Sequence, residues 1–248
     1  MTARTVLITG GSRGIGRASA LIAGAAGWNV AINWRADAAM AEQTAQDVRA
    51  AGGQAITVQG DVADEAAVDA MFAATLSAFG TLDAVVVNAG IVAPASPLAE
   101  MSLERLRRVI DTNVIGALLC ARAAARHLAR GDGPTASLVL ISSAAARLGA
   151  PGEYVDYAAS KGAIDTLTIG LSKELAAKNI RVNAIRPGII ETDIHASGGE
   201  PERARRIAPM VPMQRAGTAA EVGEAVFWLC SDSSSYVTGA IIDVAGGR

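Results

Sequence analysis

Short apolar runs alternate with longer helix-forming stretches along the whole chain. Runs rich in β-branched residues, typical of buried parallel strands, occupy residues 5–9, 29–34, 55–59, 82–87, 137–142, 180–185 and 240–244. Helix-forming stretches follow the first run up to about residue 26 and then cover residues 38–51, 65–79, 103–130, 157–178 and 219–229. Residues 192–213 show no firm period, so a loop with a little helix is expected there.

This alternation predicts an α/β fold: a single-domain Rossmann-type doubly wound parallel sheet, flanked by helices, over residues 1–248. The polar residues and glycines that bear chemistry follow directly after the strands or stand at helix starts. Ligands bind at the carboxyl edge of such a sheet. The sequence therefore predicts one dinucleotide-binding and catalytic domain with its site at this edge.

Tyr157 and Lys161 stand four residues apart at the start of a predicted helix, so their side chains share one helical face. A phenol with a pKa of about 10 is a poor acid or base at neutral pH, and a neighbouring cation lowers that pKa. Tyr157 is therefore the candidate proton donor or acceptor, with a serine hydroxyl from the strand end holding a substrate oxygen. Tyr154 is close by, but Ala158 stands where its lysine would be.

A glycine-rich turn joins the first predicted strand to the first helix. Gly10, Gly14 and Gly16 allow a tight turn and let a pyrophosphate approach the backbone at a helix N-terminus. A simple strand-to-helix turn would also explain a lone glycine cluster. Its position after a strand and before a helix favours a dinucleotide.

The end of the second strand bears on which dinucleotide binds. An NAD site usually has an acid there for the ribose 2′-hydroxyl, but here Asn33, Trp34 and Arg35 occupy the region. Arg35 suits a 2′-phosphate, and Arg13 in the glycine turn adds a second guanidinium. Asp37 is the rival, although we expect it to cap the next helix. NADP(H) is therefore the predicted cofactor, with NAD(H) as the alternative.

Composition limits the other possibilities. The 248 residues are 51% hydrophobic and 19% charged with a net charge of −2, so a nucleic-acid partner is not expected. No apolar run approaches the ~18 residues of a membrane span, and the first residues leave no room for a signal peptide. Cys120 and Cys230 lie in apolar helical segments and are expected to be buried free thiols. We expect a soluble cytoplasmic protein with no metal site.

The chain resembles the short-chain dehydrogenase/reductase family almost from end to end, in its 3-oxoacyl-carrier-protein reductase-like and glucose dehydrogenase-like branch. The resemblance implies hydride transfer between a nicotinamide and a carbonyl or alcohol. The matching motif residues are Thr9, Gly10, Gly14, Gly16, Asp61, Val62, Asn88, Ala89, Gly90, Asn113, Ser143, Tyr157, Lys161, Pro187, Gly188 and Thr192.

Four residues form the catalytic set that the resemblance implies. Ser143 would position the carbonyl and Tyr157 would transfer the proton. Lys161 would lower the pKa of Tyr157 and hold the nicotinamide ribose, and Asn113 would anchor a water. Ser143 lies fourteen residues before Tyr157, one more than the commonest family spacing, with the extra residue in the turn 149–152. Ser142 is the competitor, but it would need two extra residues.

The remaining motif residues are implied to bind the cofactor. Asp61 would meet the adenine, and Thr192 would meet the carboxamide. The full expected cofactor-binding set is Gly10, Ser12, Arg13, Gly14, Ile15, Gly16, Arg35, Asp61, Val62, Asn88, Ala89, Gly90, Tyr157, Lys161, Pro187, Gly188 and Thr192.

Partners and alternatives stay open at this point. The helices 114–130 and 157–178 are apolar on more than one face, which favours a homotetramer as in the family. The basic row Arg122, Arg126 and Arg130 suits an acidic carrier protein, although a solvated or subunit-contacting face is the simpler interpretation. A dinucleotide-sensing regulator, or an isomerase or dehydratase on the same fold, are the alternative functions. The residues expected around a largely apolar pocket are Ala93, Leu148, Tyr154, Ile190, Ile194, His195 and Met210.

Overall fold

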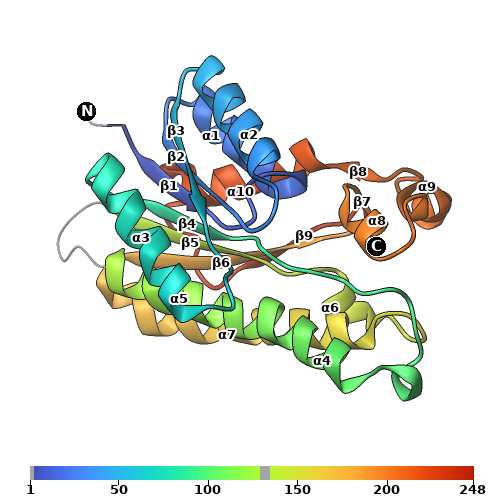
Figure 1. Cartoon of the computed structure of the whole chain (residues 1–248). Helices are drawn as coiled ribbons and strands as arrows, with labels where there is room; N and C mark the ends of the chain where they lie inside the picture. Colours follow the sequence, from blue (N-terminus) through green and yellow to red (C-terminus); the bar gives the residue numbers. More distant parts are fainter. Residues whose placement is uncertain (1–2, 129–134) are drawn as a thin grey trace.

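The computed structural model describes residues 3–128 and 135–248 and is built on one parallel sheet (Figure 1). Its seven strands lie in the order β3-β2-β1-β4-β5-β6-β9, and each neighbouring pair is parallel. The order reverses between β1 and β4, and ligand crevices form at such a point. The strands are β1 (Thr5–Ile8), β2 (Asn29–Trp34), β3 (Gln54–Gln59), β4 (Ala84–Val87), β5 (Ala136–Ile141), β6 (Ile180–Pro187) and β9 (Ile241–Val244).

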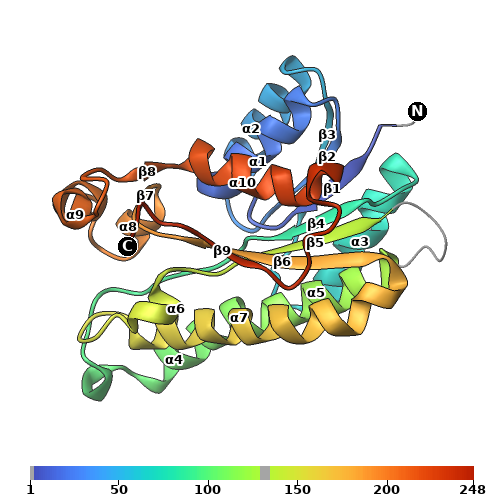
Figure 2. The ribbon, with the colours of Figure 1, turned by 180° about the vertical axis from the view of Figure 1, so that it is seen from behind.

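Helices cover both faces of the sheet (Figures 1 and 2). One face carries α1 (Gly14–Ala25), α2 (Ala38–Ala50) and α10 (Ala219–Cys230), and the other carries α3 (Glu65–Phe79), α4 (Leu103–Ile110), α5 (Gly116–His127) and α7 (Val155–Leu175). Successive strand residues point to opposite faces, so Leu7 joins the core beneath α3 and α5 while Ile8 joins the core beneath α1 and α10. The expected Rossmann-type doubly wound parallel sheet is confirmed.

The long helix predicted over 103–130 is interrupted. A π-helical turn, Asp111–Ile115, separates α4 from α5, and Asn113 lies inside it with 1% of its surface exposed. A buried asparagine inside a helix needs partners for its amide, and the Ile91 backbone and the Ser160 hydroxyl supply them. Arg130, the predicted end of this helix, lies outside the described residues.

Short elements that had no sequence period cover the carboxyl edge. They are α6 (Ala145–Leu148), β7 (Ile190–Glu191), α8 (Ile194–Ser197), α9 (Arg203–Ile207) and β8 (Gly217–Thr218), with 3-10 turns at Leu98–Glu100 and Ala208–Met210. Two further 3-10 turns, Ala176–Lys178 and Asp232–Ser234, lie at the opposite edge, where they lead into β6 and β9. Elements of two to five residues are too short to show a 2.0 or 3.6 repeat. Across residues 3–128 and 135–248, none of the helices combines the length and the apolar character that crossing a bilayer requires.

Candidate active site

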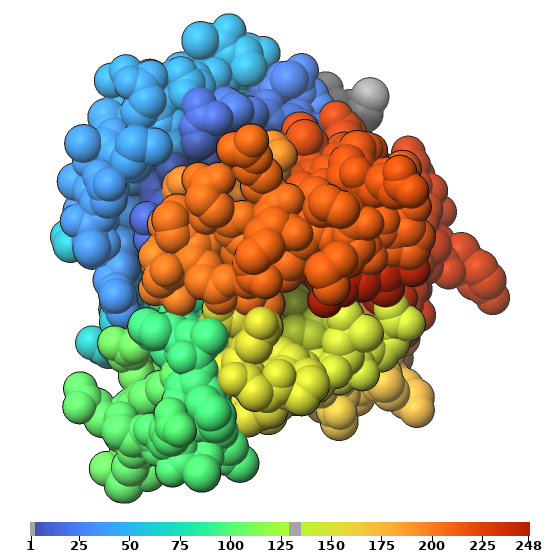
Figure 3. All heavy atoms as spheres, turned by 90° about the vertical axis from the view of Figure 1, so that its right-hand side faces the viewer, coloured from blue at the N-terminus to red at the C-terminus, as the bar shows by residue number. Residues whose placement is uncertain are grey.

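A cavity of about 530 Å³ opens at the carboxyl ends of β4, β5 and β6. It lies beneath the region of α8 and α9, which Figure 3 shows above a hollow bordered by the segment around α6. Ala93 and Met210 were expected to line the cavity, but neither does. Ala93 is buried in the interior, and Met210 is 71% exposed to solvent. The expected lining residues that do face the cavity are Leu148, Tyr154, Ile190, Ile194 and His195.

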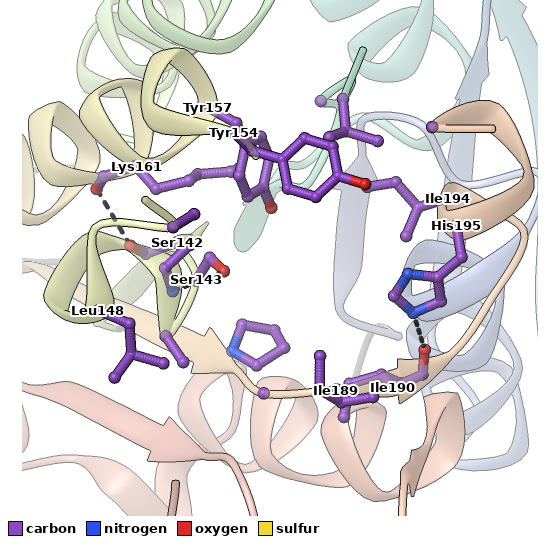
Figure 4. A pocket seen from close by; sticks show the side chains of 18 of the residues that line it. Ser142, Ser143, Leu148, Tyr154, Tyr157, Lys161, Ile189, Ile190, Ile194 and His195 are labelled. Carbon is purple, nitrogen blue, oxygen red and sulfur yellow. Dashed lines mark hydrogen bonds between the residues drawn. The ribbon is translucent and has the colours of Figure 1, made fainter. Parts of the chain in front are cut away.

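Ser143, Tyr157 and Lys161 meet on one side of this cavity (Figure 4). Ser143 follows β5 and accepts a hydrogen bond from the Ala145 amide at 3.1 Å, so its own hydroxyl hydrogen stays available. Ser143 is close enough to Tyr157 to lower the pKa of the phenol. Tyr157 and Lys161 lie one turn apart on α7, with the Lys161 ammonium 5.7 Å from the centre of the phenol ring. A hydroxyl, a phenol and a cation are thus brought to one point, as the spacing predicted.

Ser142, the competitor of Ser143, is turned away from the phenol. Its hydroxyl is buried, donates to the Asp165 carboxylate at 2.7 Å and lies 3.1 Å from the Lys161 carbonyl oxygen. Arg186 donates two hydrogen bonds to the other oxygen of Asp165, at 2.8 and 3.1 Å. Ser142 therefore fixes β5 to α7, while Ser143 is left to face the cavity.

The pKa values of the two catalytic candidates differ from the sequence expectation. Burial raises the pKa of Tyr157, and the neighbouring Ser143 hydroxyl offsets this only in part. Burial also lowers the pKa of Lys161 to about 8, while the nearby Asp165 carboxylate acts in the opposite direction. Lys161 donates one of the three hydrogens of its ammonium group to the Ile141 carbonyl at 2.7 Å, which leaves two for other partners. The net direction for Tyr157 is therefore upward, because desolvation of the phenol is the larger effect, and the lowering of its pKa by Lys161 stays a prediction.

Asn113 connects the catalytic side of the cavity to the end of β4. Its side-chain oxygen accepts from the Ile91 amide at 2.8 Å, and its amide nitrogen donates to the Ile91 carbonyl at 2.9 Å and to Ser160 at 3.1 Å. A Cβ atom at Gly90 would lie 3.4 Å from both the Asn113 oxygen and the Lys161 ammonium nitrogen. Asn113 is thus a neighbour of the site, and it holds the segment after β4 in place.

Tyr154, the N-cap of α7, belongs to a different network from that of Tyr157. Its hydroxyl donates to Glu200 at 2.7 Å, and the Arg203 guanidinium lies 4.8 Å from the centre of its ring. Burial and the bond to Glu200 raise the pKa of Tyr154 to about 12. Arg203 also pairs with Glu153 at 2.5 Å and with Glu200 at 2.9 Å. Tyr154 therefore helps to fasten the region of α8 and α9, and it has no lysine beside it.

The glycine turn is shaped to accept a dinucleotide. Gly10 and Gly14 have φ of +61° and +55°, and a Cβ at Gly16 would lie 2.4 Å from the Gly10 carbonyl oxygen, so only glycine fits. Arg13, the N-cap of α1, makes no side-chain capping bond and the first turn carries no acid, which leaves its N–H groups for an anion. These features fit the pyrophosphate of a nicotinamide dinucleotide.

The other expected cofactor residues line the path from this turn to the cavity. Ile15, Asn88, Gly90, Pro187, Gly188 and Thr192 border the cavity itself. Asn88 donates to the Thr9 and Gly10 carbonyls at 2.9 and 3.0 Å, and the Ala89 amide donates to the Thr9 hydroxyl, so this pair braces the glycine turn. Thr192 faces Gly14 across the path, where an added Cβ would lie 3.5 Å from it. The remaining members, Ser12 and Val62, lie in the turn and after β3.

Arg35 lies in the region expected to hold a 2′-phosphate, at the end of β2. The two acids near it, Asp37 and Asp61, both have partners. Arg35 is 60% exposed in its side chain and forms a loose pair with Asp61 at 3.4 Å. Asp37 caps α2 as expected, accepting from the Met40 amide at 3.0 Å. Asn33 is buried and bridges the Gly10 amide and the Gly60 carbonyl, so it acts as a brace within the fold.

Comparison with known proteins identifies the family. A family model described as Enoyl-(Acyl carrier protein) reductase matches residues 10–248. The protein named uncharacterized oxidoreductase YgfF of Escherichia coli K12 is 51% identical over 243 residues, covering 98% of both chains. The chain belongs to the short-chain dehydrogenase/reductase family. This family membership makes it an oxidoreductase with a nucleotide-binding fold that acts on CH–OH or C=O groups.

Two further relatives of this short-chain dehydrogenase/reductase carry functional names. Glucose 1-dehydrogenase 2 of Bacillus subtilis is 38% identical over 247 residues, which is 100% of this chain and 95% of the relative. A crystal structure of 3-ketoacyl-(acyl-carrier-protein) reductase from Brucella melitensis, complexed with NADH, matches with a TM-score of 0.92 at 32% identity. That match covers 100% of this chain and 98% of the other.

Sequence reasoning missed the charged residues that support the site. Asp165 stands four residues after Lys161, so the same spacing that paired Tyr157 with Lys161 would have placed it beside the lysine. Glu200 and Arg203 lie in the stretch without a period, and no local signal pointed to their contact with Tyr154. Buried Cys120 and Cys230 are free thiols, as expected.

Proposed function

We propose that this protein is an NADP(H)-dependent oxidoreductase that transfers a hydride between the nicotinamide and a carbonyl or alcohol, with Tyr157 as proton donor or acceptor. The observation that carries the proposal is the meeting of Ser143, Tyr157 and Lys161 in a cavity that Ile15 joins to the glycine turn. The cofactor supplies or takes up the hydride when it is bound. The chain's own residues hold the substrate and move the proton.

The phenol can serve as the proton donor in the reduction of a carbonyl. Its hydroxyl carries a proton at neutral pH, and although burial makes it a weaker acid by raising its pKa, the negative charge that develops on the substrate oxygen can take up that proton. The Ser143 hydroxyl donates a second hydrogen bond to the same oxygen, where negative charge develops. Lys161 is charged below a pKa of about 8 and favours that developing charge from one helical turn away. A sensor that never turned over would have no use for this arrangement.

Asn113 retains the water-anchoring role that its family position implies. Its side-chain nitrogen is fully used by Ile91 and Ser160, but its oxygen accepts only from the Ile91 amide. A carbonyl oxygen has two lone pairs, so one is left for a water. Gly90, beside Asn113 and Lys161, leaves the space that a side chain would fill.

Arg35, assisted by Arg13, supports a preference for NADPH. A 2′-phosphate needs cationic partners, and each charge-assisted contact typically contributes about 1.5–3 kcal/mol. Because Asp37 is engaged as the cap of α2, it is not the expected partner of a ribose 2′-hydroxyl. Asp61 follows β3, and we expect it to meet the adenine as its family position implies; its loose pair with Arg35 breaks at little cost.

The Arg35→Ala variant tests the cofactor preference. We expect the wild type to favour NADPH over NADH by roughly 10- to 1,000-fold in kcat/KM, and the variant to lose NADPH efficiency selectively. Arg49→Ala is the matched control, since Arg49 is a similarly exposed arginine that pairs with Glu42 on α2. Equal use of both cofactors by the wild type, or an unchanged ratio in Arg35→Ala, would assign the preference to other residues.

A homotetramer in the cytoplasm is the proposed form of the protein. Ile115, Leu118 and Ile169 on the surface of the α5 and α7 side are 43%, 42% and 45% exposed, which suits burial against a second subunit. Free buried thiols suit a reducing compartment. An acidic carrier protein is a weaker candidate partner, because Arg122 of the basic row already pairs with Glu65 at 2.5 Å.

The deciding experiment measures oxidation of NADPH and NADH by the purified protein against a panel of carbonyl compounds. The panel spans sugars, cyclic ketones and 3-oxoacyl thioesters, because the relatives' names cover sugar and acyl-carrier substrates. Turnover with any member supports the oxidoreductase. Cofactor binding without turnover of any member supports the sensor, and conversion of a substrate without net cofactor oxidation supports an isomerase or dehydratase.

A further inference from the structure

His195 faces the cavity from the side opposite Ser143 and Tyr157 (Figure 4). It lies on α8, and its Nε2 atom is 2.8 Å from the Ile190 carbonyl oxygen. A carbonyl oxygen can only accept, so Nε2 must carry the hydrogen of this bond. In the neutral ring the other nitrogen, Nδ1, is then an acceptor with a free lone pair.

The surroundings keep this ring neutral near pH 7. Burial lowers the pKa of His195 below its ordinary value of 6.5, and the Arg203 charge lowers it further. The bond to the Ile190 carbonyl and the Glu200 carboxylate act in the opposite direction without reversing the shift. No hydrogen bond from residues 3–128 or 135–248 reaches Nδ1, which Figure 4 shows on the cavity side of the ring.

Apolar side chains make up much of the wall between His195 and the catalytic side, although Thr192 and Arg248 also line the cavity. Leu148, Ile189 and Ile194 border it, and none of their side chains can hydrogen-bond a ligand. Arg203 also lines the cavity, but Glu153 and Glu200 already neutralise its charge. The wall around His195 therefore favours a neutral hydrogen-bond donor over an anion.

We propose that His195 is a specificity-determining residue whose Nδ1 atom accepts a hydrogen bond from a second hydroxyl group of the substrate. The substrate class is then a hydroxylated carbonyl compound, or the corresponding diol, with an apolar stretch between its two oxygen functions. One oxygen lies at Ser143 and Tyr157, and the other lies at His195. This inference rests on the proposed function, because it names the substrate of the same site.

A series of straight-chain hydroxy ketones of increasing length, each paired with its methyl ether, tests the inference by kinetics. The ether cannot donate, so the ratio of kcat/KM for the two members of a pair isolates the hydroxyl hydrogen. At the best chain length we expect the hydroxy ketone to be preferred by roughly 10-fold, the effect of one hydrogen bond to a buried acceptor. In His195→Phe the ratio should fall to about 1.

Two further variants separate loss of the acceptor from general damage. His195→Gln keeps an amide hydrogen for the Ile190 carbonyl and an oxygen for the substrate, so part of the preference should return. His127→Phe is the matched control and should leave the ratio at its wild-type value. His127 is the other histidine of the chain, and it stacks on Phe72 away from the cavity. A ratio near 1 in the wild type at every length, or one that persists in His195→Phe, overturns the inference. A preference for carboxylate-bearing ketones over hydroxy ketones also overturns it.

A measurement without turnover keeps the inference distinct from the proposed function. The chain has two histidines, so ¹⁵N NMR of histidine-labelled protein, with His127→Phe for assignment, reads the tautomer of His195 directly. We expect a neutral ring with protonated Nε2 at pH 7.5, and an Nδ1 signal that moves with a hydroxy ketone but not with its ether. A charged ring or a protonated Nδ1 overturns the inference even if the protein is a reductase. If no carbonyl is turned over while the expected tautomer is found and no ligand moves Nδ1, both proposals fail.

Discussion

The two sides of the cavity are held together by different forces. The catalytic side, formed by the end of β5 and by α7, is built from buried strand and helix, with Ser142 and Asp165 joining the two elements. The loop side, formed by residues 190–213, has only short elements and is fastened by ion pairs among Glu153, Glu200 and Arg203. The first is fixed by core packing, and the second by charges at the rim of the molecule.

This difference suits the two tasks of an enzyme that moves a proton. Proton transfer needs a hydroxyl at a fixed place, and a side chain on a 21-residue helix packed against a parallel sheet provides that. Substrate choice needs a surface that can differ between relatives without disturbing the chemistry, and a loop that carries few core residues can do so. We therefore expect changes on the catalytic side to lower kcat and changes on the loop side to raise KM.

The largest expected effect is that of Tyr157→Phe. The variant keeps the ring and loses only the hydroxyl that exchanges a proton, so kcat should fall by roughly 100- to 10,000-fold. Cofactor affinity, measured by NADPH fluorescence, should stay close to that of the wild type.

Tyr154→Phe is the matched control from the loop side. It removes one hydrogen bond to Glu200 and leaves the Arg203 pairs in place, so most activity should remain. The opposite pattern, an active Tyr157→Phe and an inactive Tyr154→Phe, would move the chemistry to the loop side.

The same difference explains how much the sequence could predict. Strands and helices of the sheet show clear periods, so β2 and α3 begin and end at the predicted residues, Asn29–Trp34 and Glu65–Phe79. The pairing of Tyr157 with Lys161 follows from a local four-residue spacing, whereas the choice of Ser143 over Ser142 rested on the spacing that the family resemblance implies.

The loop side was predictable only as a loop. Tyr154 and Glu200 are 46 residues apart, and Glu153 and Arg203 are 50 apart. These contacts depend on how the chain folds back across the carboxyl edge of the sheet, and a local sequence pattern does not predict them. The upward shift of the Tyr157 pKa was not predictable for a related reason: the four-residue spacing indicates a neighbouring cation, but not the desolvation of the phenol.

A middle-sized effect is expected for Arg203→Ala. The side chain of Arg203 is 11% exposed and contacts Glu153, Glu200 and the Tyr154 ring. Its loss therefore removes the contacts that hold the loop side in place. KM for the best carbonyl substrate should rise roughly tenfold, the effect of about one charge-assisted contact, while kcat changes little.

Arg205→Ala is the control for this change on the same helix. Arg205 is 89% exposed and reaches Glu202 only at 3.9 Å, so neither kinetic constant should move. A fall in kcat in Arg203→Ala with KM unchanged would show that the loop side positions the catalytic groups and not the substrate.

The smallest expected effect is a different pH dependence for the two sides of the cavity, seen in kcat for the catalytic side and in KM for the loop side. On the catalytic side Lys161 has a pKa of about 8, so only about half of it is charged at that pH, and kcat for carbonyl reduction should decline as the pH rises through this value. On the loop side the pKa of His195 lies below 6.5, lowered by burial and by Arg203 against Glu200 and the Ile190 carbonyl. Below that pH the ring gains a proton and Nδ1 stops accepting, so KM for a hydroxy ketone should rise a few-fold while kcat holds. Initial rates from pH 5.5 to 9.5, fitted for kcat and KM separately, check both limbs. If kcat and KM changed together over one pH range, the two sides of the cavity would titrate as one unit. Their separate hydrogen-bond networks argue against that outcome.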